Sequence, residues 1–157
     1  MPVLEEITYE TGRSALAEQE TAVAGVRQRT GTLLAAQALV ASFLGATTVR
    51  ANGLHTLGWV ALGALVLGLL VAAVLLAAPW QLKFSVNARE LYEQLYPQAS
   101  AEAAAETLGW LVAAGYLYQD LRVENAERVR RMSVLSAVLA AFVVAQTLAW
   151  LASLAVN

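Results

Sequence analysis

The sequence lacks cysteine entirely and contains a single histidine, His55. Without thiols the chain can form no disulfide, thiolate nucleophile, cysteine-ligated metal centre or palmitoylation site. It also contains no catalytic serine motif, phosphate-binding loop, dinucleotide fingerprint or paired metal ligands. His55 has no cysteine or carboxylate near it, so we expect a turn residue and not a metal ligand. We therefore expect a protein that is not an enzyme and needs no cofactor or metal.

Charge is scarce as well, and it is unevenly distributed. Charged residues make up 14% of the chain and hydrophobic residues 59%, against about 25% and 45–50% in an average soluble domain. No charged residue occurs in three long stretches, 30–49, 51–82 and 132–157. About 20 helical residues cross the roughly 30 Å hydrocarbon core of a bilayer, so each stretch can form a transmembrane helix. The sequence predicts an all-α membrane protein with three transmembrane helices.

The basic residues predict the orientation of the chain, because Lys and Arg in short flanking segments are retained on the cytoplasmic side. Nine of the ten precede the first stretch or lie between the second and third: Arg13, Arg27, Arg29, Lys83, Arg89, Arg122, Arg128, Arg130 and Arg131. Only Arg50 lies in the short connection between the first two stretches. We expect a protein of the inner (cytoplasmic) membrane, with the N-terminus in the cytosol and the C-terminus outside.

Six segments follow from this pattern. They are a polar leader (1–13), a cytosolic helix (14–30), transmembrane helix 1 (31–49), transmembrane helix 2 (55–79), a cytosolic helical segment (80–131) and transmembrane helix 3 (132–156). No proline interrupts residues 14–49 or 101–156, so the first and third helices are expected to extend out of the bilayer into a cytosolic helical bundle.

Local signals mark the connections between these helices. Asn52-Gly53 favours a tight turn between the first two spans. Trp59 and Trp80 lie about 30 Å apart along an ideal helix, at the depths that indole rings prefer in a bilayer. Asn87 followed by Glu90 is typical of a capping box and predicts a short helix over 88–95.

Two amides lie within the uncharged stretches, Gln37 in the first and Gln146 in the third. They are candidates for the lining of a pore, but an interhelical hydrogen bond is the favoured interpretation because amides hold membrane helices together in this way. Their predicted depths differ by about 10 Å, so they are not expected to bond each other. No Asp, Glu, Lys or Arg lies within the stretches, which argues against proton pumps, voltage sensors and ion-coupled carriers.

Small residues form a stripe at four-residue spacing on the second span, at Ala64, Gly68 and Ala72. Such a stripe lets another helix backbone approach closely. Its partner can be the first span, the third span or another copy of the chain, and the sequence does not choose among these.

Basic residues cluster at the predicted cytosolic interface, at Arg27, Arg29, Arg128, Arg130 and Arg131. Guanidinium groups at this depth can bind a nucleotide phosphate or anionic lipid headgroups. Retention on the cytoplasmic side is the favoured interpretation, because positive flanks are general to membrane proteins. The pattern gives no indication of binding to a nucleic acid polymer.

The segment 26–45, Val-Arg-Gln-Arg-Thr-Gly-Thr-Leu-Leu-Ala-Ala-Gln-Ala-Leu-Val-Ala-Ser-Phe-Leu-Gly, resembles the first span of small bacterial membrane proteins of the Pycsar and SLATT effector group. The resemblance covers about residues 14–80. It implies an anti-phage effector that assembles in the membrane and impairs it, sometimes in response to a cyclic nucleotide made by a partner enzyme. The third span departs from the two-span pattern of that group.

Two functional hypotheses follow. The first is a homo-oligomer that forms an ion channel or a membrane-perturbing effector assembly, gated through its cytosolic helices. The second is a membrane-anchored scaffold or regulatory subunit that docks a soluble partner protein. A small carrier is disfavoured, because the sequence gives no sign of the broken helices and mid-membrane polar groups that carriers use.

Overall fold

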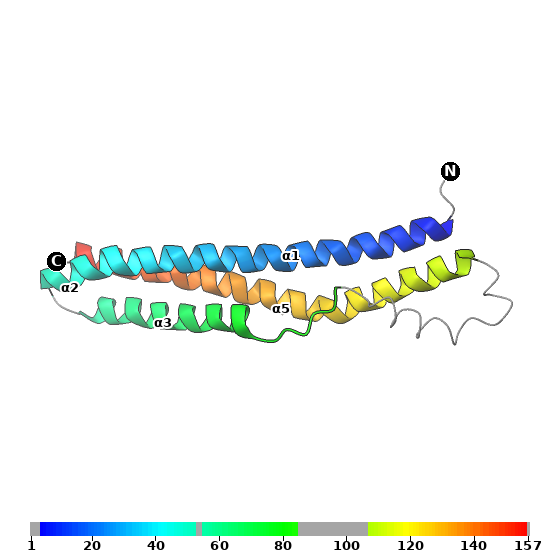
Figure 1. The fold of residues 1–157 in the computed structure, drawn as a ribbon. Coiled ribbons are helices and arrows are strands. Elements are labelled where there is room, and N and C mark those ends of the chain that lie inside the picture. Colours follow the sequence, from blue (N-terminus) through cyan, green and yellow to red (C-terminus); the bar gives the residue numbers. More distant parts are fainter. Residues whose placement is uncertain (1–3, 53–54, 85–106, 157) are drawn as a thin grey trace. The chain divides into compact units, whose positions relative to one another are not determined.

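The computed structural model describes residues 4–52, 55–84 and 107–156, and helices are the regular structure of these residues (Figure 1). The elements are α1 (Leu4–Val40), the π-helical segment η1 (Ala41–Gly45), α2 (Ala46–Asn52), α3 (Thr56–Ala77) and α5 (Thr107–Ala155). Three helices are long and apolar enough to cross a membrane: Glu6–Arg50, which includes η1, Thr56–Ala77, and Gly109–Ala155. The predicted all-α class and the three candidate transmembrane helices are confirmed.

The helix boundaries differ from the prediction mainly at the N-terminus. α1 already begins at Leu4, so residues 4–13 of the predicted polar leader are helical. Gly12 in this segment lies close to the backbone of Gly115 in α5. α3 ends at Ala77, two residues before Pro79, whose ring cannot continue a helix. The predicted helix over 88–95 and the Gly53 end of the predicted turn lie outside the described residues.

The chain divides into two compact units. Unit 1 contains residues 1–23 and 80–130, and unit 2 contains residues 24–79 and 131–157. All twelve Asp and Glu residues of the sequence fall within the ranges of unit 1. The charged residues of unit 2 are Arg27, Arg29, Arg50 and Arg131. The division by packing therefore coincides with a division by charge.

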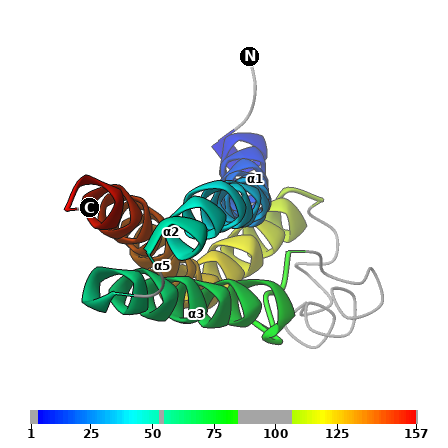
Figure 2. The same cartoon turned by 90° about the vertical axis from the view of Figure 1, so that its left-hand side faces the viewer.

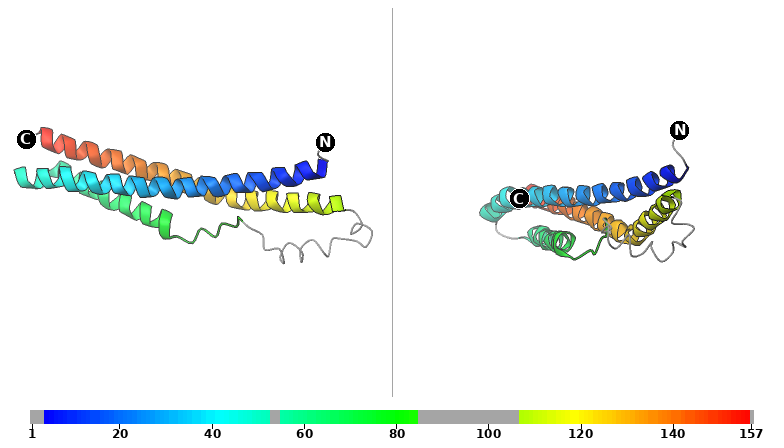
Figure 3. Two further views of the ribbon diagram at one scale, coloured as in Figure 1. Left: turned by 45° about the horizontal axis from the view of Figure 1, so that its top comes forward. Right: turned by 45° about the vertical axis from the view of Figure 1, so that its right-hand side comes forward.

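In unit 2, the most buried positions of the helices recur every seven residues. They are Thr30 and Gln37 in α1, Ala61, Gly68 and Leu75 in α3, and Met132, Leu139, Gln146 and Ser153 in α5. A seven-residue period keeps one seam of each helix facing its neighbours, as in coiled coils. Gln37 contacts both α3 and α5, so three helices meet in this unit (Figures 2 and 3). α1 and α5 run in the same direction, and α3 runs in the opposite direction.

The π-helical segment η1 shifts this seam by one position. After Gln37 the next buried seam position is Gly45, eight residues on, because the wider π turn accommodates one extra residue. A Cβ atom at Gly45 would lie 3.3 Å from Cζ2 of Trp150, so the absence of a side chain lets the indole pack closely. The hydroxyl of Thr48 donates to the Leu44 carbonyl at 2.8 Å, and Thr47 donates to the same carbonyl at 2.9 Å.

In unit 1, the first part of α1 packs against the first part of α5 at a close crossing. A Cβ at Gly12 would lie 2.6 Å from the Gly115 carbonyl oxygen, so side chains at this crossing would force the helices apart. The rings of Tyr9 and Tyr118 are tilted against each other with centroids 5.8 Å apart. Further along, the Gln19 amide donates to the Arg122 carbonyl at 2.9 Å. Close backbone contact is therefore the main feature of this helix pair.

Candidate functional site

The centre of unit 2 is an amide layer formed by Gln37, Gln146 and Gly68. Both glutamine side chains are fully buried. Nε2 of Gln37 donates to the Leu65 carbonyl of α3 at 3.1 Å. Nε2 of Gln146 donates to the Gln37 carbonyl of α1 at 3.3 Å. The Gln37 amide therefore joins α1 to α3, and the Gln146 amide joins α5 to α1. Neither side chain faces lipid, because both are buried.

These hydrogen bonds show that the expected difference in depth between the two amides is wrong. That expectation assumed that the basic borders of the first and third spans lie at the same level. In the structure, Arg29 of α1 lines the same groove as Ser133 and Ser136 of α5, which follow Arg131 along the chain. α1 therefore carries its last charge deeper into unit 2 than α5 does, and this offset brings Gln37 level with Gln146.

Oε1 of Gln37, Oε1 of Gln146 and Nε1 of Trp150 are buried in unit 2 and have no hydrogen-bond partner among the described residues. Trp150 follows Gln146 by one helical turn and lies on the same face of α5. Its indole packs with Ala61 and Ala149 in the apolar cluster of the unit. Unit 2 thus has a small polar interior, which sequence reasoning missed for Trp150.

The small-residue stripe of α3 faces the interior of unit 2. Ala64, Gly68 and Ala72 are all buried within the single chain. A Cβ at Gly68 would lie 3.0 Å from Cδ and Oε1 of Gln37 and would clash with its Nε2. The stripe therefore makes room for the Gln37 side chain, and of the three partners left open by the sequence the structure selects the first span.

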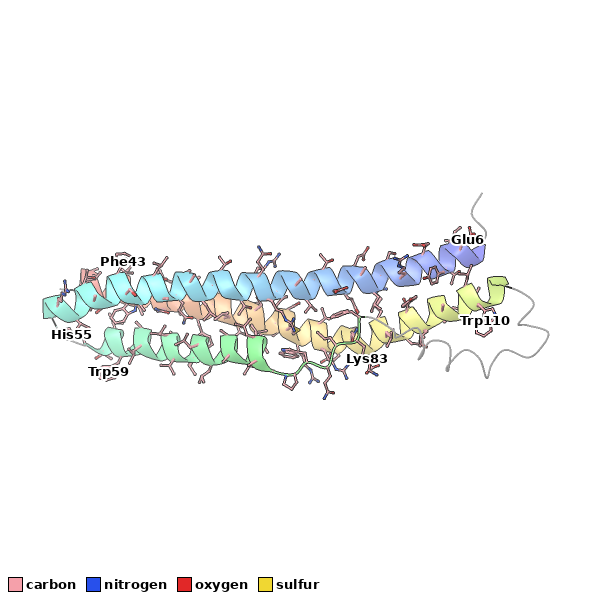
Figure 4. The ribbon with its side chains drawn as sticks, viewed as in Figure 1. Glu6, Phe43, His55, Trp59, Lys83 and Trp110 are labelled. Atoms are coloured by element: carbon pink, nitrogen blue, oxygen red, sulfur yellow. The ribbon has the colours of Figure 1, made fainter. Side chains whose placement is uncertain are left out.

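One of the predicted basic residues, Arg128, belongs to a clamp in unit 1 that the sequence did not reveal. Nδ2 of Asn125 donates to the Lys83 carbonyl at 2.8 Å, and its Oδ1 accepts the Lys83 N–H at 3.2 Å. Figure 4 labels Lys83 in the segment that follows α3. Arg128 donates to the Gln81 carbonyl at 3.2 Å and forms an ion pair with Glu124 at 3.3 Å. The clamp fixes the extended segment that follows α3 onto α5. The clamp has one signal in the sequence: Asn125 precedes Met132 by seven residues, the same spacing that separates Met132 from Leu139.

The remaining basic residues are dispersed. Nε of Arg130 lies 3.6 Å from a carboxylate oxygen of Glu127 in unit 1. Arg27, Arg29 and Arg131 belong to unit 2, where all three are exposed. Arg29 lines a groove between α1 and α5 in the described residues, and Arg27 and Arg131 do not line that groove. The five arginines thus do not form one site within either unit.

The described residues of each unit form a groove. The interfacial groove of unit 2 has a volume of about 460 Å³ and is lined by Val26, Arg29, Thr32 and Leu33 of α1 and by Ser133, Ser136, Ala137 and Ala140 of α5. The acidic groove of unit 1 has a volume of about 580 Å³ and is lined by Glu6, Ile7, Tyr9, Glu10 and Thr11 of α1 and by Leu111 of α5. Volumes of about 300–1,000 Å³ are typical of ligand sites.

Comparisons with protein-family models, with curated proteins and with solved structures found no match for this chain.

Proposed function

We propose that this protein is a non-enzymatic, membrane-anchored scaffold or regulatory subunit. In this proposal the helices of unit 2 cross the inner membrane, and unit 1 docks a soluble partner protein in the cytosol. The apolar exterior of unit 2, which includes exposed Leu70 and Val66, suits contact with lipid. The charge of unit 1, with all twelve acidic residues in its ranges, suits contact with water.

The observation that carries the proposal is apolar surface on unit 1. Tyr116 is 62% exposed and Val123 is 64% exposed, and both lie outside the three uncharged stretches. Val123 lies between Arg122 and Glu124, and Tyr116 precedes Asp120 by one helical turn. Ile7, which is 47% exposed, lines the acidic groove beside Glu6 and Glu10. In water, such surface is stabilised when a partner covers it. Carboxylates beside an apolar floor favour a basic amphipathic helix as the docked segment.

The competing proposal is the oligomeric channel or membrane-perturbing effector. The open face of α3 around Gly63, where an added Cβ would meet no atom within 4 Å, supports contact with further copies in the membrane. Against conduction, the amides that were candidates for a pore lining are buried within one chain. A pore in this proposal would need an apolar wall or a wall built from unit 1.

Photo-crosslinking in living cells distinguishes the two proposals. A photoreactive amino acid replaces Ile7 in the acidic groove, and a matched control replaces Glu18, which is exposed on α1 outside the groove. The scaffold proposal expects one adduct of a single soluble protein from Ile7 and none from Glu18. An adduct with the mass of two chains favours the oligomeric assembly. The absence of any adduct specific to Ile7 refutes docking in the groove.

Orientation is tested separately with reporter fusions at both ends of the chain. The proposal expects the N-terminus in the cytosol and the C-terminus outside, as three crossings require. Finding both ends in one compartment would contradict the three-span topology.

A further inference from the structure

We propose that the interfacial groove of unit 2 binds one anionic phospholipid, with its phosphate at Arg29 and the beginning of an acyl chain along Ala137 and Ala140. This site is independent of partner docking, because the groove is formed by residues of unit 2 alone.

The polar part of the groove has two hydrogen-bond donors available for a phosphate. Arg29 is exposed and has no ion pair or hydrogen bond among the described residues, in contrast to Arg128 and Arg130. Ser136 on the facing helix is half-buried and likewise has no partner there. Thr32 donates its hydroxyl proton to the Gln28 carbonyl at 3.2 Å, so it offers only an acceptor. A guanidinium group beside a hydroxyl is a suitable pair for a phosphate.

The apolar part of the groove lies deeper in unit 2. Leu33, Ala137 and Ala140 follow the polar residues in both helices, and α1 and α5 run in the same direction. Two alanines leave the α5 wall low, which provides space for a hydrocarbon chain beside Leu33. The groove is thus amphipathic along its length. Its charged residue, Arg29, lies in the part of the groove that is nearest in sequence to Arg27 and Arg131.

This layout favours a phospholipid over a soluble anion. Arg29 is the last charged residue before the uncharged stretch 30–49, so it lies at the depth of headgroups in the three-span topology. A soluble phosphate would occupy the polar part and leave the apolar part without a ligand. A volume of about 460 Å³ accommodates a headgroup and the first part of one chain, while the rest of the lipid stays in the bilayer.

Native mass spectrometry of the full-length protein tests the site. Protein stripped of lipid in a nonionic detergent is titrated with dioctanoyl phosphatidylglycerol, dioctanoyl phosphatidylcholine or inorganic phosphate. We expect one phosphatidylglycerol to bind more tightly than phosphatidylcholine. Arg29→Gln is expected to weaken this binding by about fivefold or more, as the loss of one arginine at a lipid headgroup implies. Arg27→Gln is the matched control, because Arg27 is exposed two residues away and does not line the groove.

Two further variants test the shape of the groove. Ala137→Leu fills the apolar part without changing any charge and is expected to weaken binding of phosphatidylglycerol. Ser136→Ala removes the hydroxyl proposed to bind the phosphate and is also expected to weaken binding, which keeps the groove testable if Ala137→Leu does not fold. Equal losses for Arg27→Gln and Arg29→Gln would show a diffuse basic surface and overturn the proposal. Displacement of the lipid by inorganic phosphate at similar concentration would show a soluble-anion site and overturn it as well.

Discussion

The substitution Gly68→Ala tests whether the amide layer holds unit 2 together. The added Cβ would lie 3.0 Å from Cδ and Oε1 of Gln37 and closer still to its Nε2, so the Gln37 side chain has to move. That movement breaks its hydrogen bond to the Leu65 carbonyl, which is 3.1 Å long. Gln37 is fully buried, so its amide finds no water in exchange.

The cost can be worked out from these contacts. Overpacking a close contact costs about 1–3 kcal/mol. Loss of an interhelical hydrogen bond in a membrane costs about 0.6–1.7 kcal/mol. Replacing glycine by alanine in a helix returns about 1 kcal/mol. We therefore expect Gly68→Ala to lower the free energy of unfolding of unit 2 by about 1–3 kcal/mol.

Reversible unfolding in lipid bicelles, followed by tryptophan fluorescence, measures this change. Gly63→Ala is the matched control, because it lies on the same helix with no atom within 4 Å of the added Cβ. We expect the control to be neutral or stabilising by up to about 1 kcal/mol. In the double variant Gln37→Ala with Gly68→Ala, the Cβ occupies the vacated space, so the combined loss should be smaller than the sum. Equal stability of Gly68→Ala and Gly63→Ala, or strict additivity in the double variant, would refute the reasoning.

Three further predictions concern other contacts. Asn125→Ala removes both hydrogen bonds between Asn125 and Lys83 and should destabilise the segment after α3 by about 1–3 kcal/mol. Faster hydrogen exchange in that segment would show the loss, and unchanged exchange would contradict it. Deletion of exposed Phe43 should convert η1 into regular α-helix and leave the melting temperature nearly unchanged. Deletion of Ala35, in the regular part of α1, should lower the melting temperature, and equal melting temperatures would argue against the extra-residue explanation. Gly115→Ala should loosen the helix crossing of unit 1 at a cost of about 1–3 kcal/mol, whereas Gly109→Ala, which meets no neighbouring atom, should not; limited proteolysis compares them, and identical patterns would count against a tight crossing.

The helices themselves were predictable because their signals are local. The uncharged stretch 51–82 is longer than a bilayer needs, and Pro79 limits the helix within it. These two signals place α3 within two residues of its bounds at either end. The same holds for the continuous third helix, in which no proline occurs between residue 107 and residue 155. The beginning of α1 had no comparable local signal, because the first residues are polar and most helical stability in proteins comes from tertiary packing. Gly12 in this segment lies close to Gly115, more than a hundred residues away.

The site depended on relations that no local signal contains. The sequence placed two amides in the membrane stretches, but the offset between α1 and α5 decided that Gln146 reaches the Gln37 carbonyl. It showed a small-residue stripe, but packing decided that Gly68 faces Gln37 and not another copy of the chain. Asn125 looked like one polar residue among many in a charged helix, and its role as a clamp required the extended segment beside it.

What the sequence determined by itself is the number of apolar helices and the separation of charge from them, because solvent preference acts on each stretch independently and sums along it. What only the tertiary structure decided is the relative level and rotation of those helices. The level and rotation depend on contacts between particular residues, such as Gly68, whose lack of a side chain makes room for the Gln37 amide. They also depend on the single extra residue that η1 adds to the first helix. Such features change the face and depth of a side chain without any change in hydropathy.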